Sequence, residues 1–171
     1  GGKFSNKNYT TSGGLHGVGA SVVNALSEYM KVEVIRSGSL YRQEFSKGLP
    51  TTSLKKIEQT KKSNGTMVSF KPDDTIFGKT NIFSPEKLLK ILEYKAYLVA
   101  GVQINWKCHS SLLLESTNVP SLKKLCFLNG LSEYINSKTA HTPLFTSSSF
   151  EDKVSIEVET VEWTIKWFTE N

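Results

Sequence analysis

Apolar residues recur every three or four positions between residues 17 and 30, which is the spacing of one face of an α-helix. The residues at this spacing are Val18, Val22, Ala25, Leu26 and Met30. The pattern therefore predicts a helix over residues 17–30. The stretch before it, residues 1–13, is rich in glycine, serine, asparagine and threonine, and we expect it to form a long loop.

Residues 31–48 alternate between apolar and polar side chains on both sides of a Ser-Gly-Ser sequence at 37–39, which predicts a β-hairpin. Residues 51–60 and 65–72 are predicted to form two more strands, joined by a polar turn. A proline and two aspartates at 72–74 are expected to end this sheet segment.

The sequence Ser-Pro-Glu at 84–86 is typical of a helix start, with serine as the N-cap and proline at the first helical position. It predicts a helix over residues 86–99, which carry a stripe of leucine and isoleucine. A strand is expected over residues 101–108, with shorter candidate strands at 111–116 and 123–128.

The character of the chain changes near residue 129. We expect a short helix over 129–138, a loop over 139–152 and one long alternating strand over 153–167. Because no partner for that strand follows before Asn171, we expect the natural chain to continue.

Length and composition describe one ordinary globular domain, or one domain and part of another, since the chain has 171 residues with 38% hydrophobic and 22% charged positions. No apolar run reaches the roughly 18 residues of a membrane span. The net charge is +5, and the lysines are scattered among apolar residues, which favours a solvated surface over a nucleic-acid patch. The spacing of Cys108 and Cys126 favours two free thiols over a metal site.

Four glycines lie between residues 13 and 19, directly before the first predicted helix. A helix start carries unpaired backbone N–H groups that bind phosphate, and glycines let the backbone approach a ligand closely. The stretch lacks the GK[ST] of a P-loop, and no apolar strand precedes it as in a dinucleotide-binding fold. Two interpretations stay open from the residues alone: a phosphate loop, or a tight loop whose glycines only permit close packing.

The segment GGKFSNKNYTTSGGLHGVGASVVNALSE resembles the ATP lid of the ATP-binding subunits of type IIA DNA topoisomerases, in the GHKL ATPase superfamily. The resemblance continues through VIRSGSLYRQEFSKG, NGTMVSFKPDDTIFG and LEYKAYLVAGVQINWKC, and VEWTIKW resembles the start of the transducer domain. Within this family, YRQEFSKG, KAYLVAGVQINWKC and VEWTIKW are more similar to the topoisomerase IV branch of alphaproteobacteria than to the gyrase B branch.

The resemblance implies an α+β fold: a GHKL (Bergerat) α/β sandwich with a mixed, largely antiparallel sheet and helices on one face. Residues 1–128 would be the C-terminal part of the ATPase domain, with the ATP lid at 1–20. Residues 129–171 would begin the transducer. The N-terminal helices and a strand of the family's ATPase domain would precede Gly1, and we expect apolar surface to be exposed in their absence.

The resemblance also implies site residues. A phosphate cradle built mainly from backbone N–H groups would comprise Gly14, Leu15, His16, Gly17, Val18, Gly19 and Ala20. Lys3 would meet phosphate charge, and Tyr9 would be directed at the adenosine, unless it only anchors the loop. Thr66 would lie beside the adenine, and Arg36 would lie on the rim of the pocket in which inhibitors of this class bind. Without the resemblance, Thr66 and Arg36 would be ordinary strand residues.

The implied cofactors are ATP and Mg²⁺. The family's water-activating glutamate, its Mg²⁺-binding asparagine and its adenine-reading aspartate correspond to positions before Gly1. The lysine that reaches the γ-phosphate corresponds to a position after Asn171. We therefore assign no catalytic residue and no metal ligand to this chain, and expect the 171 residues alone to be inactive.

The implied activity is ATP-driven passage of one DNA segment through another, with decatenation and relaxation of DNA. The implied partners are DNA, a second copy of the ATP-binding subunit, and the separate DNA-cleaving subunit of topoisomerase IV or of gyrase. The two kinds of subunit would form an A2B2 complex, and no membrane partner is expected. The expected location is the bacterial cytoplasm, or a plastid.

Four alternatives remain open. The chain could derive from gyrase B, which supercoils DNA negatively, or from another GHKL protein such as a histidine kinase or a MutL-type repair ATPase. It could also be a non-enzymatic binding module, or a degenerate paralogue that keeps the fold without the chemistry.

Overall fold

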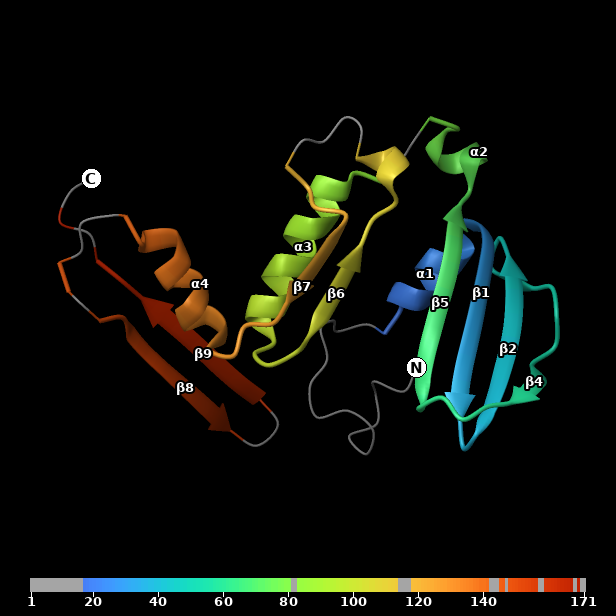
Figure 1. The fold of residues 1–171 in the computed structure, drawn as a ribbon, viewed down its shortest axis with the longest axis horizontal. Coiled ribbons are helices and arrows are strands. Elements are labelled where there is room, and N and C mark those ends of the chain that lie inside the picture. The colour runs from blue at the N-terminus through green and yellow to red at the C-terminus, as the bar shows by residue number, and fades with distance from the viewer. Residues whose placement is uncertain are drawn as a thin grey trace. The chain divides into compact units, whose positions relative to one another are not determined.

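The chain forms two compact units, Gly1–Asn81 and Ile82–Asn171. The computed structural model describes residues 17–80, 83–113, 118–141, 145–146, 148–156, 159–167 and 169. Both units combine helices with antiparallel sheets, so the expected α+β class is confirmed (Figure 1). Within the described ranges, no helix has the length and apolar character needed to cross a membrane. The proposed division into residues 1–128 and 129–171 stays a prediction.

The first unit is a five-stranded antiparallel sheet with two short helices (Figure 1). Its elements are α1 (Gly19–Ala25), β1 (Ser27–Arg36), β2 (Ser39–Ser46), β3 (Leu49–Pro50), β4 (Lys55–Gln59), β5 (Gly65–Pro72) and α2 (Asp74–Phe77). The strand order is β3-β2-β1-β5, and β4 also pairs with β2. Helix α1 packs against β1, β2 and β5.

The predicted hairpin is confirmed as β1 and β2, joined by a two-residue turn. Ser37 and Gly38 both have positive φ angles, of 49° and 70°, which suits the right-handed twist of the flanking strands. The predicted strands at 51–60 and 65–72 are confirmed as β4 and β5. They pair with β2 and β1 respectively rather than with each other.

The predicted helix over residues 17–30 is wrong in its second half, because α1 ends at Ala25 and β1 begins at Ser27. Met30 continues the strand alternation of Val32 and Val34 as well as the helical spacing, so the sequence pattern was ambiguous at this point. In the structure Met30 pairs with residues of both neighbouring strands, and this pairing determines the outcome.

The described residues of the second unit form two α-helices, one 3₁₀ helix and two two-stranded antiparallel sheets. Its elements are α3 (Pro85–Leu98), β6 (Ile104–Lys107), a 3₁₀ helix (Ser110–Leu112), β7 (Leu122–Leu125), α4 (Gly130–Thr139), β8 (Phe150–Ile156) and β9 (Glu159–Ile165). The predicted start of α3 is confirmed, since the Ser84 hydroxyl accepts a hydrogen bond from the Lys87 N–H and Pro85 opens the helix. Leu89, Ala96 and Leu125 form the buried apolar core of this unit.

Two predictions in the second unit are wrong. The candidate strand at 111–116 begins as a 3₁₀ helix, for which the His109 side chain accepts a hydrogen bond from the Ser111 N–H, and its residues 114–116 lie outside the described residues. The single long strand over 153–167 is two strands, β8 and β9, which pair antiparallel with Val154 opposite Val161. The partner of β9 is therefore present, and β8 begins within the expected loop. The connection carries no glycine or proline, so alternation alone could not distinguish one strand from two.

Candidate functional site

The glycine-rich segment leads directly into α1. Gly17 has a φ of +63°, a conformation that favours glycine, and Val18 is the N-cap of the helix. Among the described residues, no side chain caps this end, and no acidic residue lies in the first turn. A Cβ built on Gly19 would meet nothing within 4 Å. Among the described residues, the start of α1 therefore has neither a side-chain cap nor an acidic neighbour to compete with a phosphate for its backbone N–H groups.

The other cradle residues predicted from the sequence, Gly14, Leu15 and His16, lie outside the described residues, and so do Lys3 and Tyr9. The described members are Gly17, Val18, Gly19 and Ala20. Their assignment to phosphate stays a prediction.

Thr66 and Arg36 lie on the same face of the sheet in the first unit. Thr66 on β5 is directly opposite Val34 on β1, and Arg36 follows Val34 by two positions. Residues opposite each other, and residues two apart on one strand, share a face of a sheet. By the same register this face carries Met30, Val32, Val34, Tyr41, Phe45, Val68 and Phe70. The face also carries Ser39 opposite Arg36 and Gln43 opposite Val32, so it is a mainly apolar face with Thr66, Arg36 and Ser39 at one end.

Part of this apolar face is open. Val68 is 51% exposed and Phe70 is 44% exposed, and both lie on β5, which pairs within the described residues with β1 alone. Apolar side chains of β5 are therefore exposed, and the expected cause, the lack of the N-terminal elements, stays a prediction.

The opposite face of the sheet carries an ion-pair cluster. The Arg42 guanidinium donates two hydrogen bonds, of 2.9 and 2.6 Å, to Oε1 of Glu33, and the Lys31 ammonium lies 3.2 Å from Oε2. The bonds from Arg42 lower the pKa of Glu33, which is 6% exposed. A cavity of about 320 Å³ beside Glu33 is bordered by Met67 and Ile35, and by Thr66 at its edge. Since Glu33 and Met67 face away from Val34 and Arg36, this cavity is not the apolar face on which the predicted site lies.

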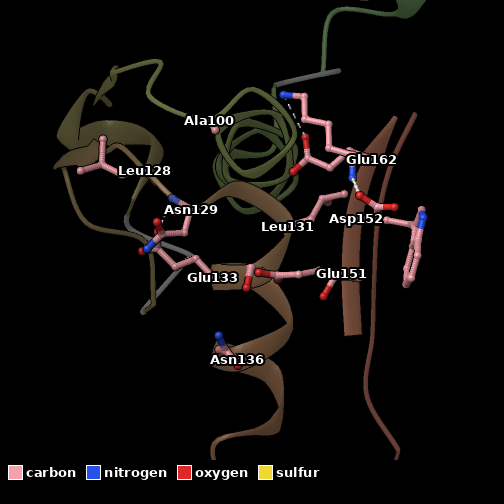
Figure 2. Close-up of a pocket in the computed structure, with 13 residues that line it drawn as sticks. Ala100, Leu128, Asn129, Leu131, Glu133, Asn136, Glu151, Asp152 and Glu162 are labelled. Atoms are coloured by element: carbon pink, nitrogen blue, oxygen red, sulfur yellow. Dashed lines mark hydrogen bonds and ion pairs between the residues drawn. The ribbon is translucent and has the colours of Figure 1, made fainter. Parts of the chain in front are cut away.

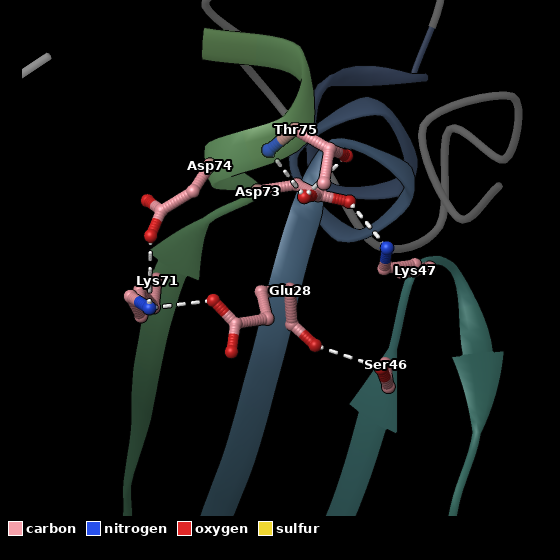
Figure 3. Close-up of polar contacts among 7 residues, drawn as sticks. All are labelled: Glu28, Ser46, Lys47, Lys71, Asp73, Asp74 and Thr75. Carbon is pink, nitrogen blue, oxygen red and sulfur yellow. Dashed lines mark hydrogen bonds and ion pairs between the residues drawn. The ribbon is translucent and has the colours of Figure 1, made fainter. Parts of the chain in front are cut away.

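Sequence reasoning missed a second polar cluster, at the end of the sheet where β1 begins and β5 ends (Figure 3). Asp73, which is 4% exposed, accepts hydrogen bonds from the Thr75 hydroxyl at 2.7 Å and the Thr75 N–H at 2.9 Å. Its other oxygen lies 3.0 Å from the Lys47 ammonium. The bonds from Thr75, and then the pairing with Lys47, lower the pKa of Asp73 from 3.8 to about 2.

The same end of the sheet carries a more exposed ion pair (Figure 3). The Lys71 ammonium lies 2.5 Å from a Glu28 carboxylate oxygen and 3.5 Å from the Asp74 carboxylate. The hydrogen bond to Glu28 is the main reason that the pKa of Lys71 is raised. A local signal did exist for Asp73, because Asp-Asp-Thr is typical of a helix N-cap. The pairing of Asp73 with Lys47, which is 26 positions away, had none.

Two further cavities, each about 600 Å³, lie in the second unit. Figure 2 shows the first, where α4 faces β8 and β9, with four carboxylates at its border. These belong to Glu133, Glu151, Asp152 and Glu162. Glu162 pairs with Lys153 at 3.6 Å, and the Asp152 carboxylate accepts a hydrogen bond from the Lys153 N–H. In the described parts of the chain, no group of three or more histidine, cysteine or acidic side chains is placed to hold a metal ion.

The second cavity of this unit lies among α3, β7 and α4. Tyr94, Tyr97, Phe127 and Tyr134 pack against one another beside it. Lys90 and Lys138 lie over the rings of Tyr94 and Tyr134. Cys108 and Cys126 are free thiols, as expected.

The fold is similar to those of solved ATP-binding domains of gyrase B and topoisomerase IV. The 43K ATPase domain of Thermus thermophilus gyrase B, solved in complex with an aminocoumarin, matches with a TM-score of 0.68 and 32% identity, over 83% of this chain and 37% of that one. The topoisomerase IV ATP-binding domain of Francisella tularensis, solved with a small-molecule inhibitor, matches with a TM-score of 0.67 and 27% identity, over 89% and 39%. The expected GHKL fold is therefore confirmed.

The chain is related in sequence to the B subunit of DNA topoisomerase 4. It is 45% identical to this protein from Bartonella bacilliformis over 169 residues, which are 98% of the chain and 24% of the relative. The relative from Caulobacter vibrioides gives the same values, and that from Enterococcus faecalis is 42% identical over 92% of the chain and 23% of the relative. No protein-family model matches the chain. The chain spans about a quarter of the length of these relatives, and the resemblance to type II topoisomerase subunits is confirmed over that quarter.

Proposed function

We propose that this chain is part of the ATP-binding subunit of a bacterial type II DNA topoisomerase, most similar to topoisomerase IV. The observation that carries the proposal is the 45% identity to the B subunit of DNA topoisomerase 4 over 98% of the chain. Under this proposal residues 1–128 contribute to the ATPase domain, and residues 129–171 begin the transducer.

In this proposal the start of α1 holds the triphosphate of ATP. The backbone N–H groups of residues 17–20 supply the contacts, together with Gly14, Leu15, His16 and Lys3. The proposal is supported by the positive φ of Gly17 and, within the described part of the chain, by the room for a Cβ on Gly19 and the lack of a side-chain cap at the start of α1. Backbone donors at a helix start favour an anion without any catalytic side chain.

The adenosine end of the nucleotide is assigned to the apolar face of the sheet. The Thr66 hydroxyl would donate a hydrogen bond beside the adenine. Tyr9 would contact the adenosine, and Arg36 would border the pocket. The shared face of Thr66, Val34 and Arg36 supports this assignment, because an apolar surface with a few polar groups suits a nucleobase.

Bound Mg²⁺ would neutralise phosphate charge, and its ligands would come from elsewhere in the full-length protein. The residues of this chain bind and orient the nucleotide. The bound nucleotide favours a closed, dimeric state through contacts that exist only in that state. The proposed partners are DNA, a second copy of the same protein and a DNA-cleaving subunit, in the bacterial cytoplasm.

The test uses the full-length ATP-binding subunit together with its DNA-cleaving partner, interlinked DNA circles, ATP and Mg²⁺. We expect ATP-dependent decatenation, and we expect Thr66→Val to raise the Kd for ATP about 2- to 10-fold, since one hydrogen bond is lost. Thr66→Ser keeps the hydroxyl and is the matched control. An assembly that neither hydrolyses ATP nor passes DNA would contradict the proposal and favour a degenerate paralogue. ATP-dependent negative supercoiling would assign the chain to gyrase B instead.

A further inference from the structure

Helix α1 has few contacts of its own to fix its position. It has seven residues, none of them buried, and no side-chain cap at its start. A helix this short is not stable by itself in water, so its position depends on the elements that contact it. The question is which contacts hold it.

The C-terminal end of α1 is held by two segments that are distant in the sequence. One is the turn after β2, where the Asn24 side-chain amide donates to the Gly48 carbonyl at 3.3 Å and the Lys47 N–H donates to the Ser27 carbonyl at 2.9 Å. The other follows β5, where the Asp73 N–H donates to the carbonyl of Leu26 at 3.0 Å. Both segments therefore attach to the chain at the junction of α1 and β1.

The two segments are also joined to each other. The Lys47 ammonium pairs with the buried Asp73 carboxylate, which the Thr75 hydroxyl and N–H hold in place (Figure 3). Because Asp73 is almost fully buried, removing its cation leaves a charge with little solvent contact, and the local structure must adjust.

Gly48 makes the close approach of the turn to α1 possible. Its φ is +85°, and a Cβ built on it would lie 3.3 Å from the Cα of Ala25. Lys47 also has a positive φ, of 50°. A conformation that is unfavourable for ordinary residues is thus maintained where the turn meets the helix.

We propose that Lys47, Gly48 and Asp73 form a clamp that positions α1, and that this clamp sets the affinity of residues 17–20 for the phosphates of a nucleotide. The inference rests on the proposed function of α1. All three are positioning residues, since they act on the nucleotide through the helix.

The test uses the full-length ATP-binding subunit, for which ATP hydrolysis and the binding of a non-hydrolysable ATP analogue with Mg²⁺ are measured. We expect Lys47→Met to raise the KM for ATP and the Kd for the analogue about 3- to 10-fold, with kcat within about twofold of wild type, because ground-state and transition-state binding are lost equally. Lys47→Arg keeps a cation at Asp73 and is expected to restore the wild-type KM. A general loss of folding would lower kcat as well, and arginine would not restore KM selectively.

Lys71→Met is the matched control, since Lys71 lies at the same end of the sheet and its ion-pair partners, Glu28 and Asp74, lie outside α1. We expect it to leave KM unchanged. Asn24→Ala is a second test that keeps the buried ion pair, and we expect a smaller rise in KM. Unchanged KM and Kd in both Lys47→Met and Asn24→Ala would overturn the clamp while leaving the proposed function intact. A wild-type protein that binds no nucleotide would overturn both.

Discussion

Helices α1 and α3 differ in the kind of contact that holds them in place. Helix α3 has fourteen residues, a serine cap and two buried side chains, Leu89 and Ala96, which pack with Leu125 of β7. Helix α1 has half that length, no side-chain cap and no buried residue. It contacts β1, β2 and β5, and among the described residues hydrogen bonds from distant segments hold its C-terminal end.

The kind of contact that holds each helix determines how a substitution affects it. Apolar packing fixes α3 over its length, because any displacement would open space in the core. Among the described residues, hydrogen bonds from distant segments reach α1 at its C-terminal end, so the position of α1 depends on the segments that supply them. The effects of substitutions in the two regions should therefore differ in size and in the elements that they destabilise.

The largest effect is expected in the apolar core around α3. Leu125→Ala removes a side chain that is 2% exposed, and we expect the free energy of opening of α3 and β7 to fall by about 2–5 kcal/mol. Hydrogen exchange of the amides of α3 measures it. Leu122→Ala, on the same strand but 67% exposed, is the control and should change little.

A smaller effect is expected at the turn that contacts α1. Gly48→Ala places a Cβ against Ala25 at a positive φ, and should destabilise the surrounding β1 and β2 by about 1–3 kcal/mol. Hydrogen exchange should increase in α1, β1 and β2 and remain unchanged in α3. Equal increases in α1 and α3 would contradict the contrast between them.

The cap of α3 should contribute less again. Ser84→Ala removes the hydrogen bond to the Lys87 N–H, and we expect a loss of about 1 kcal/mol, seen as faster exchange in the first turn of α3. Ser84→Asp retains an oxygen acceptor, and exchange should then stay near the wild-type rate. Faster exchange in both variants would mean that the cap does not stabilise the helix.

A pH dependence should distinguish the polar clamp from the apolar core. Because the pKa of Asp73 is lowered to about 2, its contribution to stability is complete above the ordinary pKa of 3.8 and is lost as the pH falls from about 4 to about 2. The midpoint of thermal unfolding, measured between pH 5 and pH 2, should fall less steeply in Asp73→Asn than in wild type. Identical slopes would show that the Asp73 carboxylate is not stabilised as the geometry indicates.

The parts of the fold that follow from local signals were predictable from the sequence. The Ser-Gly turn of the first hairpin and the Ser-Pro-Glu start of α3 each depend on a few adjacent residues, and both predictions are confirmed. The end of α1 and the division of β8 from β9 depend on strand pairing. At the end of α1 the same apolar residues fit two periodicities, and at β8 and β9 a single alternation fits one strand or two, so both predictions were wrong.

The candidate site divides in the same way. The glycine segment and Thr66 could be identified because a sequence motif carries them. The pairing of Lys47 with Asp73 could not, since it exists only when β2 and β5 flank β1 in the folded sheet. The roles of Gly17, Val18, Gly19 and Ala20 at phosphate stay a prediction.

The most direct test of the central claim is hydrogen exchange at residues 17–20 of the full-length protein, with and without a non-hydrolysable ATP analogue and Mg²⁺. If backbone N–H groups at the start of α1 hold the phosphates, their exchange should slow strongly when the analogue binds. An analogue that binds with measurable affinity and leaves exchange at these four residues unchanged would contradict the account.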